Sequence, residues 1–578
     1  MLDTKDLLLS DKRNHFGWRP IGFTLESDSQ PEFRFLMSKH RSRVGDIVAV
    51  KMEVPSADYK GKNPTIYVWG RVTGISRYNP FFPYEAAQEL SDEGLSLRDT
   101  ILSDSRDQLE ASVLILGCTP ADNAKILFPL TYPVQPAAEV WYPPAEWAKE
   151  LLAGAVGDGT QVNIGTLIAR SDVDVNISAD KMVARHLAIL AMTGGGKTVA
   201  ARRILRELIA AGYPILIFDP HGDYLGFSQK KALFPGRSIK LFFPHVVMSS
   251  EQRGIVEKLI ARMTQGLSDP QREFLSQLMS GIEPKTGTSV RAYISSLLKQ
   301  LEKRISTPNQ GERLPTMYAV RRALNHVDGY LHRMEVTNDR MRATFARKGL
   351  TGFEQLPDPN GSPEQIIAPN QVSILYLGGY DQLTQCTIVS ILMESLFDHR
   401  AALTDAIPPF ATFIEEAHTF IPSIREGAED APSVDTLRRV ITEGRKFGTG
   451  LVLITQRPSR VDETILSQCN SFLVLRLVNP KDHSFVRSVM ENMSDADSKL
   501  LPGFGPGQGI VSGQAVRFPL LVQLKKDDDL MFRELGDENF IEQAKNWKAP
   551  KEAAGRASSS ATAKKLEEVP SRKPKKKA

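Results

Sequence analysis

The stretch that most constrains the fold is residues 189–198, where an apolar run leads into a glycine-rich turn and then into a helical pattern. Backbone N–H groups can surround a polyphosphate at a helix N-terminus only where the chain approaches closely, which favours glycine. The last eight residues match the phosphate-binding loop G-x-x-x-x-G-K-[ST], except that Ala191 replaces the leading glycine. We expect this position to end the strand and to need no positive φ. The sequence therefore predicts a nucleotide site.

The loop predicts ATP and Mg²⁺ as cofactors. Lys197 is expected to reach the β- and γ-phosphates, and the Thr198 hydroxyl is expected to bind the metal. The remaining residues predicted to contact the nucleotide are Thr193, Gly194, Gly195, Gly196 and Val199.

Length and composition limit the classes of protein to which this chain can belong. A chain of 578 residues suggests roughly two to four domains. No apolar run approaches the ~20 residues that cross a bilayer, and the N-terminus lacks a signal-peptide pattern, so we expect a cytoplasmic protein without a membrane partner. Cys118, Cys386 and Cys469 are far apart and are expected to be buried hydrophobes. His221 and His418 lack a ligand set with usable spacing, so no zinc site is predicted.

The net charge of +4 arises in the C-terminal tail. From Lys548 onward the chain carries ten Lys or Arg and three Glu, so the tail contributes +7 and the rest is −3. Binding to DNA would therefore need a local basic patch. Residues 548–578 are also rich in Ala, Ser and Pro and are predicted to be disordered.

Residues 1–165 are predicted to form a small β-barrel that serves in structure or assembly. The pattern is one of short alternating strands separated by turn residues. A polar excursion covers residues 84–107, and a glycine-containing connector covers residues 145–180. The clearest strands are residues 44–53, 64–72, 111–117 and 126–130.

The rest of the chain predicts an α/β domain with a doubly wound parallel sheet, in two parts, residues 166–222 and 366–547. Between them, residues 223–365 are expected to form a mostly helical insertion that is well placed to contact a substrate. Polar residues follow several strands, at the sheet edge where ligands bind. The strand candidates are residues 186–190, 214–218, 372–377, 410–414, 450–454 and 471–475, with a final strand at 520–524.

Two acids follow the strand at 410–414. In a P-loop ATPase one such acid orients the metal shell and the next polarises the attacking water. We assign Glu415 to the metal, directly or through water, and Glu416 to the water. Gln456 ends the next strand and is predicted to sense the γ-phosphate, while Asp219 is expected to help position the water or metal.

Arg445 lies on a glycine-flanked turn, between Gly444 and Gly448. A guanidinium in such a place can stabilise charge on a transferred phosphoryl group, often from a neighbouring subunit. Arg445 is therefore the candidate arginine finger.

In this order the motifs resemble the HerA family of DNA translocases, within the class that also holds the FtsK-like pumps. The resemblance covers roughly nine-tenths of the chain. It is carried by Arg185-His186 before the loop, and by residues 219–224, 414–418, 443–448, 455–458 and 505–509.

The resemblance implies a RecA-like P-loop ATPase core, an N-terminal HAS barrel and a homohexameric ring that encircles double-stranded DNA. It implies that Arg445 acts in trans and that Arg185 is a second arginine near the phosphates. It also implies a partner that docks on the barrel side. A NurA-type nuclease would give DNA end resection and recombinational repair.

Three alternatives stay open from the sequence. Bacterial relatives pair with other effectors in antiviral defence. A conjugation or secretion-type ring ATPase keeps the same fold, although the chain has no transmembrane segment. A nucleotide-gated scaffold would scarcely hydrolyse ATP, against which Lys197, Thr198, Glu416 and Gln456 argue.

Overall fold

The computed structural model describes most of the chain between residues 17 and 530. Its described residues are 17–26, 32–38, 41–53, 65–78, 108–121, 123–247, 254–264, 266–283, 288–309, 311–403, 405–423, 431–490, 493–530 and 544–545. The predicted excursion at 84–107 and the predicted tail at 548–578 lie outside them.

A closed barrel forms near the N-terminus, as predicted, with strand order β1-β2-β5-β4-β3-β6. Its interior is filled by buried apolar side chains such as Phe33, Phe35 and Val68. The strands are β1 (Arg19–Thr24), β2 (Glu32–Met37), β3 (Ile47–Glu53), β4 (Thr65–Tyr78), β5 (Gln108–Pro120) and β6 (Glu139–Tyr142).

The predicted strand at 126–130 is wrong. Phe128 makes only an isolated antiparallel bridge to Cys118. The next residue is Pro129, which has no N–H to donate to a ladder, so pairing stops there.

Besides the barrel, the structure contains a 12-stranded sheet, in the order β12-β11-β13-β10-β14-β15-β9-β16-β17-β18-β7-β8. The strands from β12 to β16 are parallel, which confirms the predicted parallel sheet. Its central strands are almost wholly buried because helices cover both faces. They are β9 (Leu187–Leu190), β10 (Ile215–Asp219), β13 (Gln371–Tyr376), β14 (Phe410–Ile414), β15 (Thr449–Thr455) and β16 (Ser471–Leu475).

Antiparallel strands extend the sheet beyond β16. These are β17 (Gln508–Gly513), β18 (Leu520–Leu524), β7 (Gln161–Leu167) and β8 (Asp174–Ser178). The segment expected to be a connector thus holds two strands of the sheet, together with α3 (Ala145–Val156) and α4 (Ala179–Ala184). The expected domain boundary at residue 165 falls inside β7.

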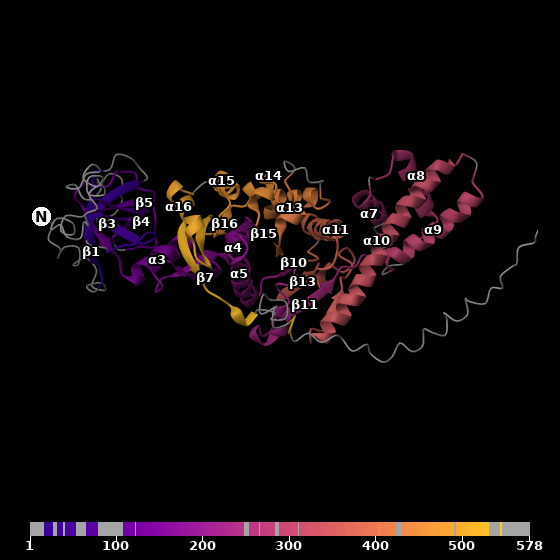
Figure 1. The fold of residues 1–578 in the computed structure, drawn as a ribbon, viewed down its shortest axis with the longest axis horizontal. Coiled ribbons are helices and arrows are strands. Elements are labelled where there is room, and N and C mark those ends of the chain that lie inside the picture. Colours follow the sequence, from indigo (N-terminus) through magenta and orange to yellow (C-terminus); the bar gives the residue numbers. More distant parts are fainter. Residues whose placement is uncertain are drawn as a thin grey trace, which may run out of the picture. The chain divides into compact units, whose positions relative to one another are not determined.

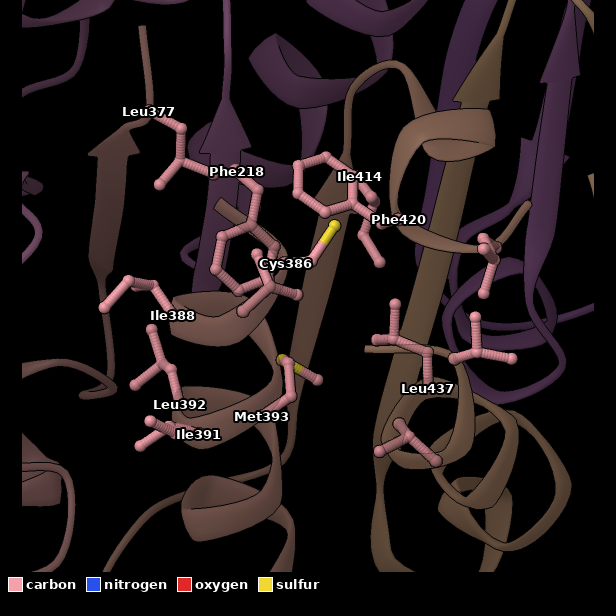
Figure 2. Packing of buried hydrophobic residues seen from close by; sticks show 14 of the residues in the cluster. Phe218, Leu377, Cys386, Ile388, Ile391, Leu392, Met393, Ile414, Phe420 and Leu437 are labelled. Carbon is pink, nitrogen blue, oxygen red and sulfur yellow. The ribbon is translucent and has the colours of Figure 1, made fainter. Parts of the chain in front are cut away.

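Helices on the two faces of the sheet bury separate apolar cores. On one face, α5 (Lys197–Ala211) packs through Ile204 and Leu208. On the other lie α11 (Gln382–Ala401) and α13 (Val434–Phe447). Figure 2 shows part of this second core, where Phe218, Ile414 and Cys386 lie close together. All three cysteines are buried, as predicted.

The helical insertion is shorter than predicted. It comprises α7 (Ile255–Met263), α8 (Asp269–Ser280), α9 (Val290–Ser306) and α10 (Leu314–Arg347), of which α8, α9 and α10 pack side by side (Figure 1). At its two ends, β11 (Ser238–Phe243) and β12 (Phe353–Gln355) are strands of the sheet. The expected range 223–365 therefore included two strands of the sheet.

Short helices complete the part of the chain that the structure describes. They are α6 (Gly226–Gln229), α12 (Ala417–Phe420), α14 (Glu463–Ser467), α15 (Pro480–Val489) and α16 (Asp495–Leu500). Among the described residues, no helix combines the length and apolar character needed to span a bilayer.

A buried ion pair links β4 of the barrel to α16. Arg71 Nη1 and Nη2 donate to Asp497 Oδ1 and Oδ2, both at 2.8 Å, and both side chains have 0% exposure. Such a bidentate pair fixes the relative position of its two elements, because neither charge tolerates separation inside a protein.

Candidate nucleotide-binding site

Four neighbouring parallel strands bring most of the predicted site residues to one edge of the sheet. The strands lie in the order β10-β14-β15-β9. At their carboxyl ends they present Asp219, then Glu415 and Glu416, then Gln456, then the glycine-rich loop. Residues that are more than 200 positions apart in the chain therefore lie together at the carboxyl ends of these strands.

The glycine-rich loop has the backbone conformation that only glycine adopts easily. Gly194 and Gly196 have φ of 76° and 102°, and α5 begins at the next residue, Lys197. A Cβ at Gly196 would lie 3.0 Å from the backbone nitrogen of Gly507, whose N–H donates to the carbonyl of Gly195 at 3.3 Å. The loop is thus backed by the segment before β17 and can present backbone N–H groups to a phosphate.

Ala191 behaves as expected at the end of β9. It is fully buried, and its N–H donates to the carbonyl of Thr455 at 3.2 Å. It is not among the described residues with positive φ, so the position does not require glycine. Thr198 and Val199 lie in the first turn of α5 and are half-buried.

Lys197 lies between the two predicted acids. Its Nζ is 2.6 Å from Glu415 Oε1 and 2.6 Å from Glu416 Oε1. Burial lowers the pKa of Lys197, but the charges of Glu415 and Glu416 outweigh it, so this pKa is raised. The ammonium stays charged and can bind an anion in place of either carboxylate.

Glu415 is fully buried and is oriented by Tyr224, for which no role was predicted. The Tyr224 hydroxyl donates to Glu415 Oε2. Burial raises the pKa of Glu415, against the lowering effect of Lys197. Tyr224 belongs to the 219–224 motif, so its position was visible in the sequence, but its contact was not.

Glu416 has the left-handed conformation that side chains other than glycine rarely adopt, with φ 52° and ψ 48°. Such backbone costs about 1–2 kcal/mol and is concentrated at functional sites. Glu416 Oε2 lies 3.2 Å from His418 Nδ1, yet no aligned hydrogen bond from the described residues reaches this buried oxygen. This oxygen can accept a further hydrogen bond.

Gln456 lies against the glycine-rich loop, because the Thr193 hydroxyl donates to its Oε1. The residue before it, Thr455, is fully buried, and its Oγ1 accepts the N–H of Arg457 at 3.0 Å. The candidate sensor is thus held next to the place where phosphate would bind.

Asp219 ends β10 and is engaged by the backbone of the turn that follows. Its side chain is fully buried, and it accepts backbone N–H groups from Gly222 at 2.7 Å and from Asp223 and Tyr224 at 3.0 Å each. Burial, with a smaller effect from Asp223, raises the pKa of Asp219 to about 7. Asp219 shapes the turn that carries Tyr224, and its link to Glu415 runs through that tyrosine.

The two predicted arginines, Arg445 and Arg185, lie near the amino-terminal ends of the parallel strands, whereas the glycine-rich loop lies at their carboxyl ends. Arg445 is exposed near the end of α13, before β15 begins, and Arg185 follows α4, before β9 begins. The seven residues of β15 span about 20 Å, so neither arginine reaches Lys197 of its own chain. Arg185 donates to Gln514 and lines a cavity of about 570 Å³ that Lys181 and Arg517 also line.

The residues at the first edge fit a nucleotide accompanied by Mg²⁺. Such a metal takes most of its ligands from phosphates and water and needs one or two protein oxygens. Thr198 offers a hydroxyl, and Glu415 offers the buried Oε1, which lies 2.6 Å from Lys197 Nζ. The described residues contain no cluster of three or more His, Cys, Asp or Glu that could hold a metal by itself.

The chain is similar to several known proteins. The family model "Helicase HerA, central domain" matches residues 162–396. A probable helicase of Methanocaldococcus jannaschii is 27% identical over 547 residues, covering 90% of this chain and 98% of that protein. The DNA double-strand break repair helicase HerA of Pyrococcus furiosus is 25% identical, covering 72% and 78%. Among solved structures, VirB4 of Thermoanaerobacter pseudethanolicus is 14% identical with a TM-score of 0.44, covering 65% of this chain and 100% of that one.

Proposed function

The chain belongs to the HerA family of helicases, and on this premise we propose that it hydrolyses ATP to drive movement along double-stranded DNA. The observation that carries the proposal is the meeting of Lys197, Glu416 and Gln456 beside the glycine-rich loop. A phosphate-binding loop, a buried acid with a free oxygen and an amide at the next strand end are the parts that phosphoryl transfer to water requires.

The roles of the residues follow from their positions. The loop N–H groups and Lys197 bind the phosphates, and Gln456 contacts the γ-phosphate. When bound, Mg²⁺ neutralises charge on the phosphates, and Thr198 and Glu415 would hold it, directly or through water. Glu416 takes the proton of the attacking water.

Binding of ATP would also release Glu416. In the structure Lys197 Nζ contacts both carboxylates at 2.6 Å. A triphosphate competes for the same ammonium, and once Lys197 turns toward it, Glu416 is left to accept the proton of water. Hydrolysis is thus coupled to occupation of the loop.

We propose that the working form is a homohexameric ring in which Arg445, and with it Arg185, reaches the nucleotide of the neighbouring subunit. The position of both arginines at the sheet edge remote from Lys197 supports a shared site. Hydrolysis at such a site changes the contact between two subunits, and a ring of this kind tracks phosphates without reading bases.

We further propose a partner that docks on the barrel side, with a NurA-type nuclease and DNA end resection as the first candidate. Several relatives are named as DNA double-strand break repair helicases, which supports this choice. Antiviral defence with another effector is the second candidate.

The test is the ATPase rate with and without linear duplex DNA, together with the mass of the assembly. We expect DNA-stimulated turnover from a particle of six chains, lost in both Lys197→Ala and Arg445→Ala. The control is Lys446→Ala, which removes the next and equally exposed base. Turnover indifferent to DNA, or full activity in Arg445→Ala, would contradict the proposal.

A further inference from the structure

His418 occupies a position that the roles above leave unexplained. It lies in α12, two residues after Glu416, and its side chain is 17% exposed. Its Nδ1 is 3.2 Å from Glu416 Oε2 and 3.1 Å from Thr455 Oγ1. Nδ1 thus lies between the candidate base and Thr455, the last residue of β15 and the neighbour of Gln456.

A hydrogen bond between Nδ1 and Glu416 has only one possible direction. An ionised carboxylate can only accept, so such a bond places the proton on Nδ1. Thr455 Oγ1, 3.1 Å from Nδ1, accepts the N–H of Arg457 and has a second lone pair that can accept the same Nδ1 proton. A small rotation of the ring would move this hydrogen bond from Thr455 to Glu416.

Glu416 needs such a donor once ATP is bound. At present Lys197 holds its Oε1 at 2.6 Å, while Oε2 has no aligned partner among the described residues. When Lys197 turns to the phosphates, the strained backbone alone would not fix the direction of the carboxylate.

We propose that His418 is a positioning residue that holds Glu416 through Nδ1–H and ties it, through Thr455, to the strand carrying Gln456. Glu416 and Gln456 are then held in fixed positions relative to each other, on either side of the attacking water. This inference rests on the proposed ATP hydrolysis, with Glu416 as base.

Charge near the ring is compatible with this role. Burial lowers the pKa of His418, Glu416 raises it, and Arg457, Lys197 and Arg460 lower it. The ring is therefore neutral near pH 7 and carries one N–H, which a hydrogen bond to Glu416 would place on Nδ1.

The test compares two amide variants of the full-length protein. His418→Asn places an N–H near the position of Nδ1, whereas His418→Gln is one methylene longer and places it near Nε2. We expect kcat to fall on the order of 10- to 100-fold in His418→Gln and to stay within about threefold of wild type in His418→Asn. The Kd for a fluorescent ADP analogue should be the same in both.

Controls separate this inference from its premise. His332→Gln changes an exposed histidine of α10 and should leave the DNA-free ATPase rate unchanged. Equal kcat values for His418→Asn and His418→Gln, whether high or low, would overturn the role of Nδ1. Full turnover in Glu416→Gln would instead overturn the proposed function itself.

Discussion

The buried pair between Arg71 and Asp497 allows a quantitative prediction. Asp497 accepts two hydrogen bonds from Arg71 and one from the Ser494 hydroxyl, all at 2.8 Å. Replacing Asp497 with Asn leaves the guanidinium buried at 0% exposure without its counter-charge. We expect this to lower the free energy of unfolding by about 3–5 kcal/mol, as when one partner of a buried pair is removed.

Removing both partners should cost far less than removing one. In the double variant Arg71→Met/Asp497→Leu neither charge is buried, and apolar side chains of similar volume take their place. We expect its stability to lie within about 1 kcal/mol of wild type or above it.

Urea unfolding followed by tryptophan fluorescence is a suitable assay, because Trp69 is on the same strand as Arg71 and stacks on Trp147 with ring centroids 6.4 Å apart. The control is Glu110→Gln, which breaks the partly exposed pair with Arg34 and should cost under about 1 kcal/mol. A loss in Asp497→Asn no larger than in Glu110→Gln, or additive losses in the double variant, would refute this reasoning.

Three further predictions concern single residues of the core. Glu416→Gln should abolish turnover while the Kd for ATP stays unchanged; retained hydrolysis would contradict the assignment of Glu416 as base. Tyr224→Phe removes the donor to Glu415 Oε2, so kcat should fall on the order of tenfold with the fold intact by circular dichroism; an unchanged kcat would mean that Glu415 needs no such support. Burial lowers the pKa of His186 from 6.5 to about 4. Between these two pH values the unfolded chain binds a proton at this residue that the native chain does not bind. Stability should therefore fall by about 3 kcal/mol as the pH drops from 6.5 to 4, and this fall should be missing from His186→Asn, whose amide oxygen can still accept the N–H of Leu451.

Much of the sheet edge was predictable because a parallel sheet places the ends of its strands together. Each central strand is a short apolar run followed by polar residues, so the sequence alone predicts that Glu415, Glu416 and Gln456 lie near one another. The glycine-rich loop also identified the apolar run directly before it, β9, as one of the central strands.

The outer strands were not predictable in the same way. β7 and β12 pair with strands far away in the chain, β18 and β11, and their own sequences resemble turns or short connectors. The roles of Asp219 and His418 also depend on conformation. The carboxylate of Asp219 accepts N–H groups of the turn at 222–224, and Glu416, which His418 contacts, has a left-handed backbone.

The placement of Lys197 and Arg445 at opposite sheet edges has a genetic consequence. On the proposed shared site, a chain with Lys197→Ala still offers an intact arginine edge, and a chain with Arg445→Ala still offers an intact loop edge. In a mixed ring some interfaces then join two undamaged edges. Two alleles that are each inactive should therefore complement each other in one cell, whereas two alleles damaged at the same edge should not.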